Sequence, residues 1–459
     1  MSEMVLFHKF PAKWNKKEFI EHQLADSNSV QTLLQQAITT GINSMLEEDI
    51  YIQLCSELRE LHGIGHLHIV QGFIPDEAKN WFVEEQAGRY PVNQFMTYWC
   101  ITDIRQLKEL PKAEFVFSRG NYTQLHWFLR DNEVVHPNVR WIHYPATSVF
   151  FPHLESYRSY GDDSKHDGFN KTPRLIQHVL GMGVEHGLEL PELTSLAAIQ
   201  EGFHLLMNHF QKLRDTQVSG PYHAVLVDDE SSMDFYQKKY PNCLIMAFRK
   251  PSLIKVKELR FERRHDLIFC GTTLQTTKNH NQFLELLDQL DLLASKRLSV
   301  AVVGNQGNLP AFSEGLRKQY NHLQVMDFGE VSRQRLADLF NDSRAQIILS
   351  GRDSNPRVIQ EAGVCGARVL VADTLSDGYD VIKTHPILGK LISTNKESWF
   401  YQQSGNLVFD VDQTFAQQIL QELEHSKHPF LTSSLAQDLY SFESVMHSIS
   451  DFLKVQNLD

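Results

Sequence analysis

Residues 346–373 constrain the fold more than any other stretch, because they predict a strand, a loop, a helix and a second strand in quick succession. Ser354 or Asn355 can cap the helix, and Pro356 suits its first position, where a missing N–H costs nothing. Residues 367–372 then return as an apolar strand. A loop between a parallel strand and a helix is where an α/β sheet places its ligand.

Two carboxylates frame the start of this predicted helix. Asp353 stands just before it and Glu361 in its second turn. The free N–H groups of a helix start suit phosphate, whereas carboxylates accept hydrogen bonds from hydroxyl groups. The stretch therefore predicts a ligand that carries both phosphate and hydroxyl groups.

The length and charge of the chain restrict its class. At 459 residues it is too long for one ordinary domain, so two or three are expected. A formal net charge of −12 argues against nucleic-acid binding through overall charge, and leaves only weak peripheral membrane contact open. The local basic residues alternate with acids and are therefore interpreted as a solvated linker face; they are Lys255, Lys257, Arg260, Arg263 and Arg264.

Cysteine usage and hydropathy predict the compartment. The five cysteines are scattered, with no CxxC pair, which suits a reducing compartment and gives no zinc-site spacing. The N-terminus lacks the apolar core of a signal peptide, and no apolar run reaches the roughly 18 residues of a membrane span. We expect a cytoplasmic protein without a transmembrane segment.

Alternating strands and helices predict two α/β units. In the first half, residues 1–60 are expected to be mostly helical, residues 157–172 form a long loop, residues 250–265 form the interdomain linker, and strands are predicted at 66–70, 113–117, 139–144, 222–227 and 244–248. In the second half, strands are predicted at 267–270, 298–303, 323–326 and 346–349, and helices at 283–294, 310–320 and 332–340. The tail is expected to be helical, with residues 434–452 as its longest helix.

Residues 260–385 resemble the donor domain of the GT-B glycosyltransferases that use nucleotide sugars, specifically family 4. Four elements carry the resemblance: Cys270-Gly271 through Lys278, Val302-Val303-Gly304, the segment 325–332 with Leu336 and Phe340 behind it, and the acidic-x7-Glu motif from Asp353 to Glu361. The sequence departs from the family pattern at two positions. Asp353 replaces the usual Glu, and Thr272 stands where an Arg that contacts the diphosphate is usual.

The resemblance implies a GT-B fold, in which two Rossmann-like α/β domains face a cleft and C-terminal helices cross back. Residues 1–253 would form the acceptor-side domain, 254–410 the donor domain, and 411–459 the helices across the junction. The reaction would require the donor, a nucleotide diphosphate sugar, and would require neither a metal ion nor another cofactor. The acceptor could be a glycan such as a polysaccharide, a lipid-linked glycan, a protein or a small molecule.

The resemblance also implies roles for individual residues. Lys278 would neutralise the donor diphosphate, Asp353 would hold hydroxyls of the transferred sugar, and Glu361 would bind the ribose hydroxyls. The other implied donor-site residues are Gly271, Thr272, Thr273, Gly329, Val331, Ser354, Asn355 and Arg357.

The N-terminal half offers weaker candidates. Arg119 and Asp228 follow predicted strands and could face the acceptor, although a structural or capping role explains each at least as well. His166 is a candidate general base, with Asp167 beside it, but it is one of 22 histidines. No nucleophile motif is needed, because in the resembled group transfer usually proceeds with retention and no evident protein nucleophile.

The predicted function is sugar transfer from a nucleotide diphosphate sugar to an acceptor hydroxyl, with retention. One alternative is a non-catalytic GT-B protein that binds a nucleotide sugar or a partner, which the substitutions at Thr272 and Asp353 would favour. Another is epimerisation or phosphorolysis of a sugar on the same fold.

Overall fold

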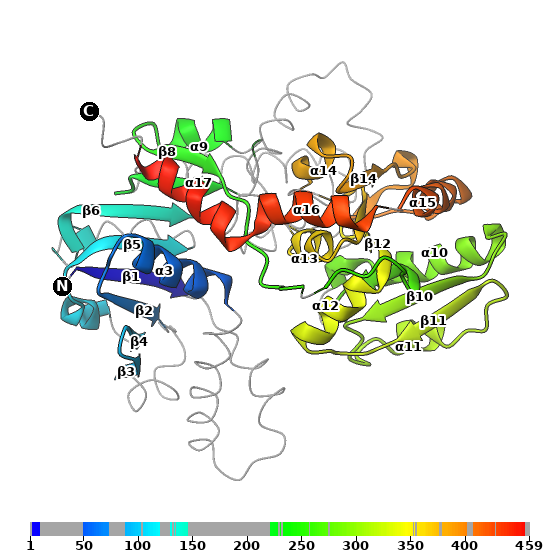
Figure 1. Cartoon of the computed structure of the whole chain (residues 1–459), viewed down its shortest axis with the longest axis horizontal. Coiled ribbons are helices and arrows are strands. Elements are labelled where there is room, and N and C mark those ends of the chain that lie inside the picture. The colour runs from blue at the N-terminus through cyan, green and yellow to red at the C-terminus, as the bar shows by residue number, and fades with distance from the viewer. Residues whose placement is uncertain are drawn as a thin grey trace, which may run out of the picture.

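The structure is a computed structural model. It describes residues 2–9, 49–72, 88–101, 104–119, 129–130, 133, 135–145, 221–227, 230, 233–256, 258–273, 276–351, 353, 356–375, 379–401, 407–426 and 428–454. Figure 1 shows two sheets with helices packed on them, and α16 and α17 running in front from one to the other.

The N-terminal sheet has, within the described residues, eight strands in the order β3-β4-β2-β1-β5-β6-β7-β8. Their bounds are β1 Glu3–Lys9, β2 His66–Gly72, β3 Gly88–Asn93, β4 Met96–Ile101, β5 Ala113–Arg119, β6 Val135–Tyr144, β7 Ala224–Val227 and β8 Leu244–Ala247. All neighbours pair in parallel except β3 and β4, which are antiparallel. Strand order reverses between β1 and β5, so the crevice for a ligand opens at the carboxyl ends of those strands.

The prediction that residues 1–60 are mostly helical is wrong for the first described stretch. Residues 3–9 form the central strand β1, paired with β2 on one side and β5 on the other. The short apolar run from Met4 to Phe7 is fully buried in the sheet, and a run this short has no helical periodicity to test. The last part of the 1–60 segment is helical as predicted, because α3 spans Ile50–Leu61.

The C-terminal sheet has six parallel strands in the described residues, ordered β11-β10-β9-β12-β13-β14. They are β9 His265–Cys270, β10 Leu298–Val303, β11 Leu323–Asp327, β12 Ser343–Ile348, β13 Arg368–Ala372 and β14 Gly389–Ile392. Numbered within this domain the order is 3-2-1-4-5-6, the doubly wound arrangement whose ligand crevice lies between strands 1 and 4. The strands predicted for this half of the chain are confirmed. They could be predicted because the sheet is buried on both faces, so that its strands are continuous apolar runs in the sequence.

Helices cover both faces of each sheet. On the C-terminal sheet, α10 (His280–Leu293), α11 (Pro310–Leu316) and α15 (Gln413–His425) share one core, and α12 (Arg333–Asn341), α13 (Val358–Val364) and α14 (Asp380–Thr384) share the other. On the N-terminal sheet, α3 packs on one face, while η1 (Ile104–Glu109) and α9 (Met233–Lys239) pack on the other. Short elements complete the second domain: η4 (Thr276–Lys278), η5 (Lys396–Ser398) and the strand pair β15 (Phe400–Tyr401) with β16 (Leu407–Val408).

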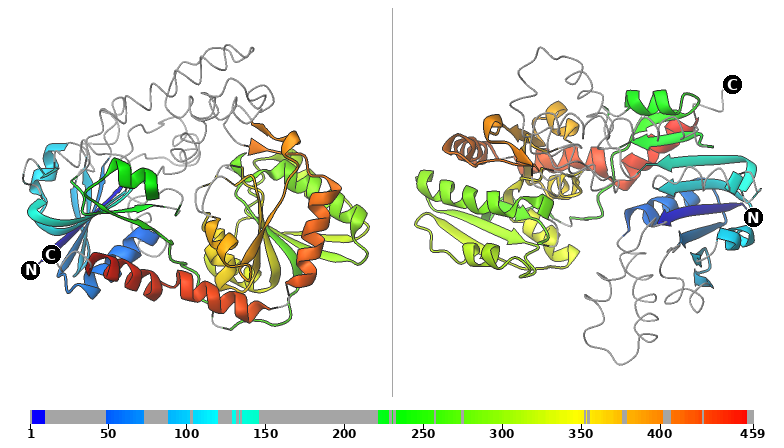
Figure 2. Two further views of the ribbon diagram at one scale, coloured as in Figure 1. Left: turned by 90° about the horizontal axis from the view of Figure 1, so that it is seen from above. Right: turned by 180° about the vertical axis from the view of Figure 1, so that it is seen from behind.

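The C-terminal helices cross back to the first domain, as Figure 2 shows from above. Helix α16 (Pro429–Tyr440) packs on α13, and α17 (Phe442–Lys454) packs on α3, where Val445, Met446 and Ile449 join the N-terminal core. The predicted single helix over 434–452 is wrong, because it breaks at the extended residue Ser441. The break lets the chain leave one domain and dock on the other.

The linker is less solvated than its charge pattern indicates. Arg260 forms an ion pair with Asp342, and the half-buried Arg263 donates from Nη1 to the carbonyl oxygens of Asn341 (2.5 Å) and Cys365 (3.0 Å). These arginines fasten the linker to the ends of α12 and α13.

Within the described chain, no helix combines the length and apolar character needed to cross a bilayer.

Candidate functional site

A cavity of about 620 Å³ lies between the two domains and is lined by both. The N-terminal domain and the linker supply Asp49, Ile50, Tyr51, Arg119, Tyr144 and Lys250, and the C-terminal domain supplies Cys270, Gly271, Thr272, Lys278, Leu336, Asp353, Pro356, Arg357, Val358 and Glu361. Arg119 ends β5, Gly271 follows β9, and Asp353 follows β12. Both sheets therefore present the carboxyl ends of strands at their reversal points to one cavity, which is where doubly wound sheets bind ligands.

Lys278 and Asp353 form an ion pair in the wall of this cavity. Their side chains are 18% and 21% exposed, so most of each lies out of water while one edge faces the cavity. The sequence predicted both residues for one site, in separate roles. The structure brings them together and adds a direct contact.

Asn279 fixes the loop that carries Lys278. Its side-chain amide donates to the carbonyl oxygens of Leu349 (2.7 Å) and Leu407 (2.8 Å), and its own backbone is left-handed with φ 57°. Gly351 lies against the same strand, because a Cβ there would overlap the carbonyl oxygen of Leu407. These contacts hold the Lys278 loop and the segment leading to Asp353 in register with each other.

The Gly271 loop packs against the loop after β10. The N–H of Gly271 donates to the carbonyl of Val303 (3.0 Å), and Thr273 donates to that of Gly304 (3.1 Å). The hydroxyl of Thr273 accepts from the N–H of Gln306 (3.0 Å), and Thr273 is buried. Thr273 thus ties two loops together, whereas Thr272 lines the cavity.

Glu361 is buried in α13 and borders the cavity. Burial raises the pKa of its carboxyl group above the ordinary value, while the guanidinium groups of Arg357 and Arg333 oppose that shift. The helix begins at Val358, with Arg357 at the cap position, so the predicted start at Pro356 is wrong by two residues. Pro356 instead accepts a turn hydrogen bond from the N–H of Ile359 (3.0 Å).

Cys270 also borders the cavity. Burial raises the pKa of its thiol to about 12, and a thiol at neutral pH is a poor nucleophile because the thiolate is the reactive form. Cys270 is therefore a small apolar lining residue here.

Several predicted residues are not among the described residues that line the cavity. Gly329 and Val331 are outside the described lining of the cavity; Gly329 instead accepts from the N–H of Gly304 (2.7 Å), and Val331 packs in the core beside α12. Four others fall outside the described residues: His166, Asp228, Ser354 and Asn355. Their roles stay predictions.

Sequence reasoning missed three residues on the N-terminal side of the cavity: Tyr51, Tyr144 and Lys250. Tyr144 ends the strand predicted at 139–144, and this position at a strand end was the available signal. Only the sheet order shows that these ends meet the loops of the C-terminal domain at one cavity. In the described residues there is no cluster of His, Cys, Asp and Glu that could hold a metal ion.

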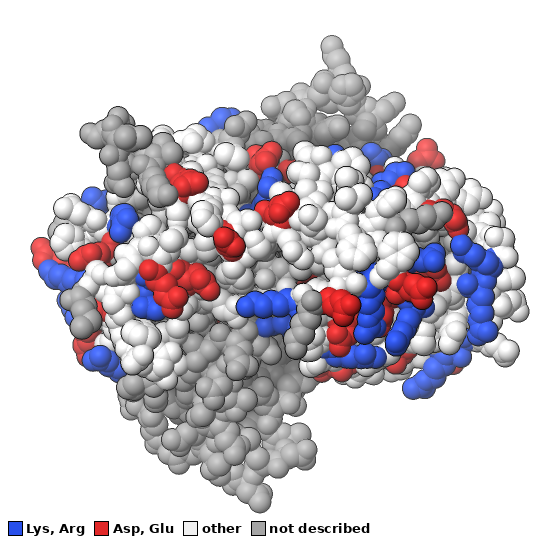
Figure 3. All heavy atoms as spheres, viewed as in Figure 1, with Lys and Arg blue, Asp and Glu red and all other residues white. Residues whose placement is uncertain are grey.

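Side chains of both charge signs are mixed on the face that Figure 3 shows. On the face shown in Figure 3, Lys and Arg side chains are interleaved with Asp and Glu over the C-terminal domain. The net negative charge of the chain therefore does not set the character of the cavity, whose lining includes both signs.

The architecture and the cavity define a two-domain α/β protein with paired ligand crevices. Residues 253–398 match the family described as glycosyl transferases group 1. This match confirms the resemblance predicted from the motifs of residues 260–385. The finer assignment to family 4 stays a prediction.

Two solved structures are similar to this chain over almost its whole length. Sucrose-phosphate synthase from Thermosynechococcus elongatus is 11% identical, with 99% of each chain covered and a TM-score of 0.49. HepE from Anabaena in complex with UDP-glucose is also 11% identical, with 99% of this chain and 100% of that chain covered and a TM-score of 0.47. A search of curated protein sequences gave no match.

Proposed function

We propose that this protein transfers a hexosyl group from a nucleotide diphosphate sugar to an acceptor hydroxyl, with retention. One observation carries the proposal: Gly271, Lys278, Asp353, Arg357 and Glu361, drawn from separate motifs, line the same interdomain cavity. The match of residues 253–398 to group 1 glycosyl transferases supports it.

The donor would occupy the C-terminal wall. Lys278 would meet the diphosphate, and its fixed charge would stabilise the negative charge that develops on the leaving group. Arg357 lies beside Glu361 at the same wall and could supply the cation that Thr272 does not. Glu361 would accept hydrogen bonds from the ribose, and Asp353 from the transferred sugar.

The acceptor would enter from the N-terminal wall, where Arg119 lies. The cavity lies between two domains joined by a linker and by α16 and α17, so closure of the domains would exclude water from the reacting atoms. No resident metal is required by this arrangement, and we expect donor binding to persist in a chelator.

A thermal-shift panel tests the donor site. UDP, GDP, ADP and CMP and their sugars are added to wild type and to Glu361→Ala, and one nucleotide series should raise the wild-type melting temperature more. If no nucleotide stabilises wild type more than it stabilises Glu361→Ala, the donor-site proposal fails. The anomeric configuration of the product, read by NMR, then decides between retention and inversion.

Turnover separates the enzyme from a non-catalytic binding protein of the same fold. Thr272 in place of the usual Arg is the feature that favours the second function. Clear nucleotide-sugar binding without donor consumption, over a range of hydroxyl acceptors, would support that alternative.

A location in the cytoplasm also stays a prediction.

A further inference from the structure

The N-terminal wall of the cavity carries two cations, each placed over a tyrosine ring. The guanidinium carbon of Arg119 lies 4.5 Å from the centre of the Tyr51 ring, and Lys250 Nζ lies 5.5 Å from the centre of the Tyr144 ring. The two rings stack on each other with their centres 5.5 Å apart. The four side chains therefore form one layer that faces the donor-side loops.

The fold holds this layer rigidly. Tyr51 and Tyr144 are buried, and Lys250 is only 8% exposed. Tyr144 also packs edge-on against Phe248 (5.6 Å between ring centres). Arg119 is held at the end of β5, at the reversal point of the sheet. A positioned cation in a confined, partly apolar site attracts an anion more strongly than an exposed one does.

Among the described lining residues of this wall the acid is Asp49, which has a structural role. Asp49 caps α3, and its Oδ1 accepts from the N–H groups of Tyr51 (2.8 Å) and Ile52 (3.2 Å). The opposite wall carries two cations among the described lining residues, Lys278 and Arg357. Lys278 pairs with Asp353, and Arg357 lies close enough to Glu361 to lower its pKa.

We propose that Arg119 and Lys250 form a subsite for an anionic group on the acceptor, namely a phosphate or carboxylate on a hydroxyl-bearing sugar. The proposal rests on the proposed function, because it places the acceptor in the cavity that would hold the donor. Arg119 binds the oxyanion through two parallel N–H groups, and Lys250 binds it as a point charge. Anchoring the anion fixes the direction of the acceptor hydroxyl toward the donor.

The first experiment measures binding to the unliganded full chain by calorimetry. The probes are glucose 6-phosphate, glucuronate and glucose, and the variants are Arg119→Gln, Arg119→Lys and Lys250→Met. We expect the wild type to bind at least one anionic sugar roughly tenfold or more tightly than glucose, and Arg119→Gln to remove most of that preference. Arg119→Lys should recover part of it, and the affinity should fall with added salt.

Arg140 provides a matched control. It lies on β6 of the same sheet with its guanidinium carbon 5.5 Å from the Phe115 ring centre, but it is exposed and lies outside the described cavity lining. Arg140→Gln should bind all three sugars as wild type does. If Arg140→Gln weakened anionic binding as much as Arg119→Gln, the effect would be one of overall charge, and the subsite would be refuted.

Nucleotide binding separates this proposal from the donor site. Arg119→Gln should leave the affinity for the stabilising nucleoside diphosphate within about twofold of wild type, whereas Lys278→Met should lower it roughly tenfold. Equal losses in both variants would assign Arg119 to the donor and overturn the acceptor subsite, as would glucose binding as tightly as both anionic sugars. Arg119-dependent binding of anionic sugars in a chain that binds no nucleotide would support the subsite while refuting the donor function.

Discussion

Lys278 and Asp353 lie 75 positions apart in the sequence, yet they form an ion pair in the wall of the interdomain cavity. The doubly wound sheet causes this meeting, because β9 and β12 are neighbours and both side chains come from loops at the carboxyl ends of those strands. A donor would replace the pair with two interactions. Its diphosphate would take Lys278, and its sugar hydroxyls would take Asp353.

Replacing Lys278 should therefore affect phosphate recognition selectively. Lys278→Met should weaken a nucleoside diphosphate roughly tenfold and the matching nucleoside little, because only the former carries the charge that Lys278 meets. Calorimetry on both ligands measures the difference. Lys296→Met is the control, because Lys296 pairs with Glu424 on the exposed surface. Equal weakening of nucleoside and diphosphate would show that Lys278 does not contact phosphate.

Asp353→Asn should separate the two roles in the opposite direction. The amide cannot form the ion pair, so Lys278 is freed and diphosphate affinity should stay equal or rise. The gain in affinity that the sugar of the donor supplies should fall, because one hydroxyl acceptor is lost. The measurement is the ratio of affinities for the nucleotide sugar and the nucleoside diphosphate, in wild type and in Asp353→Asn. An unchanged ratio would remove Asp353 from the sugar site.

Glu361 predicts a pH dependence of nucleotide binding. Burial raises the pKa of its carboxyl group, so as the pH is lowered this group is protonated at a higher pH than an ordinary Glu. A ribose hydroxyl donates a hydrogen bond to the ionised carboxylate, so the affinity for the nucleotide should fall as the pH drops through this raised pKa. At pH values above that pKa the carboxylate is already ionised, and nucleotide binding should release no proton from it. Calorimetry between pH 5 and pH 8 measures this.

Glu361→Gln should flatten that profile and also raise the melting temperature of the unliganded protein at neutral pH. The sign follows from linkage. A carboxyl group whose pKa is higher in the folded state than in the unfolded state costs stability once pH exceeds the unfolded value, and the neutral amide removes that cost. A lower melting temperature of Glu361→Gln at neutral pH would contradict the buried, destabilising charge.

Much of the C-terminal domain was predictable from the sequence, because strands buried on both faces form continuous apolar runs and their helices carry recognisable starts. The helix predicted at 332–340, for example, is α12 (Arg333–Asn341), and the hydroxyl of its cap residue Ser332 accepts from the N–H of Arg335 (3.3 Å). Other features depend on tertiary placement. The break at Ser441 follows from docking on two domains, and Lys250 and Tyr144 reach the cavity only through the sheet order. No local pattern records either fact.

Gly304 should be intolerant of a side chain. Its φ is +94°, and a Cβ there would lie 2.7 Å from the carbonyl oxygen of Gly271. Gly304→Ala should therefore destabilise by about 2–3 kcal/mol and displace the Gly271 loop from the cavity. Gly307 is the control, with φ +73° but open space around its Cβ among the described atoms. Gly307→Ala carries only the backbone strain, about 1 kcal/mol. Equal losses in denaturant unfolding would show that the Gly271 contact is unimportant.

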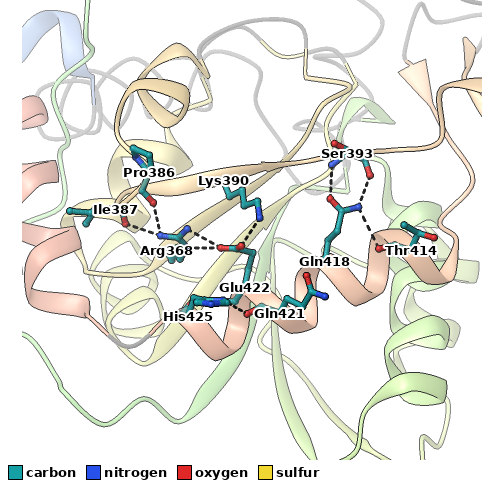
Figure 4. A network of polar contacts seen from close by, with 11 residues as sticks. Arg368, Pro386, Ile387, Lys390, Ser393, Thr414, Gln418, Gln421, Glu422 and His425 are labelled. Carbon is teal, nitrogen blue, oxygen red and sulfur yellow. Dashed lines mark hydrogen bonds and ion pairs between the residues drawn. The ribbon is translucent and has the colours of Figure 1, made fainter.

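Glu422 joins α15 to the edge of the C-terminal sheet, as Figure 4 shows. Its Oε2 accepts from Arg368 on β13 (2.8 Å), and its Oε1 accepts from Lys390 on β14 (2.8 Å). Burial alone would raise the pKa of the Glu422 carboxyl, but the hydrogen bonds from Lys390 and Arg368 outweigh it and lower the pKa below the ordinary value. The network thus ties a helix of the tail to two strands of the C-terminal sheet.

Glu422→Gln should cost about 1–3 kcal/mol at neutral pH, because it leaves two nearby cations without their carboxylate. The lowered pKa means that this stability is present above the unfolded pKa and is lost as pH falls through the folded one, so Glu422→Gln and wild type should converge in acid. Glu424→Gln is the control, because the Glu424–Lys296 pair is more than half exposed on both sides and should contribute about 0–1 kcal/mol. Urea unfolding at pH 7 and below pH 4 measures both differences, and a gap between Glu422→Gln and wild type that persists in acid would show that packing, not the ion pairs, holds α15 to the sheet.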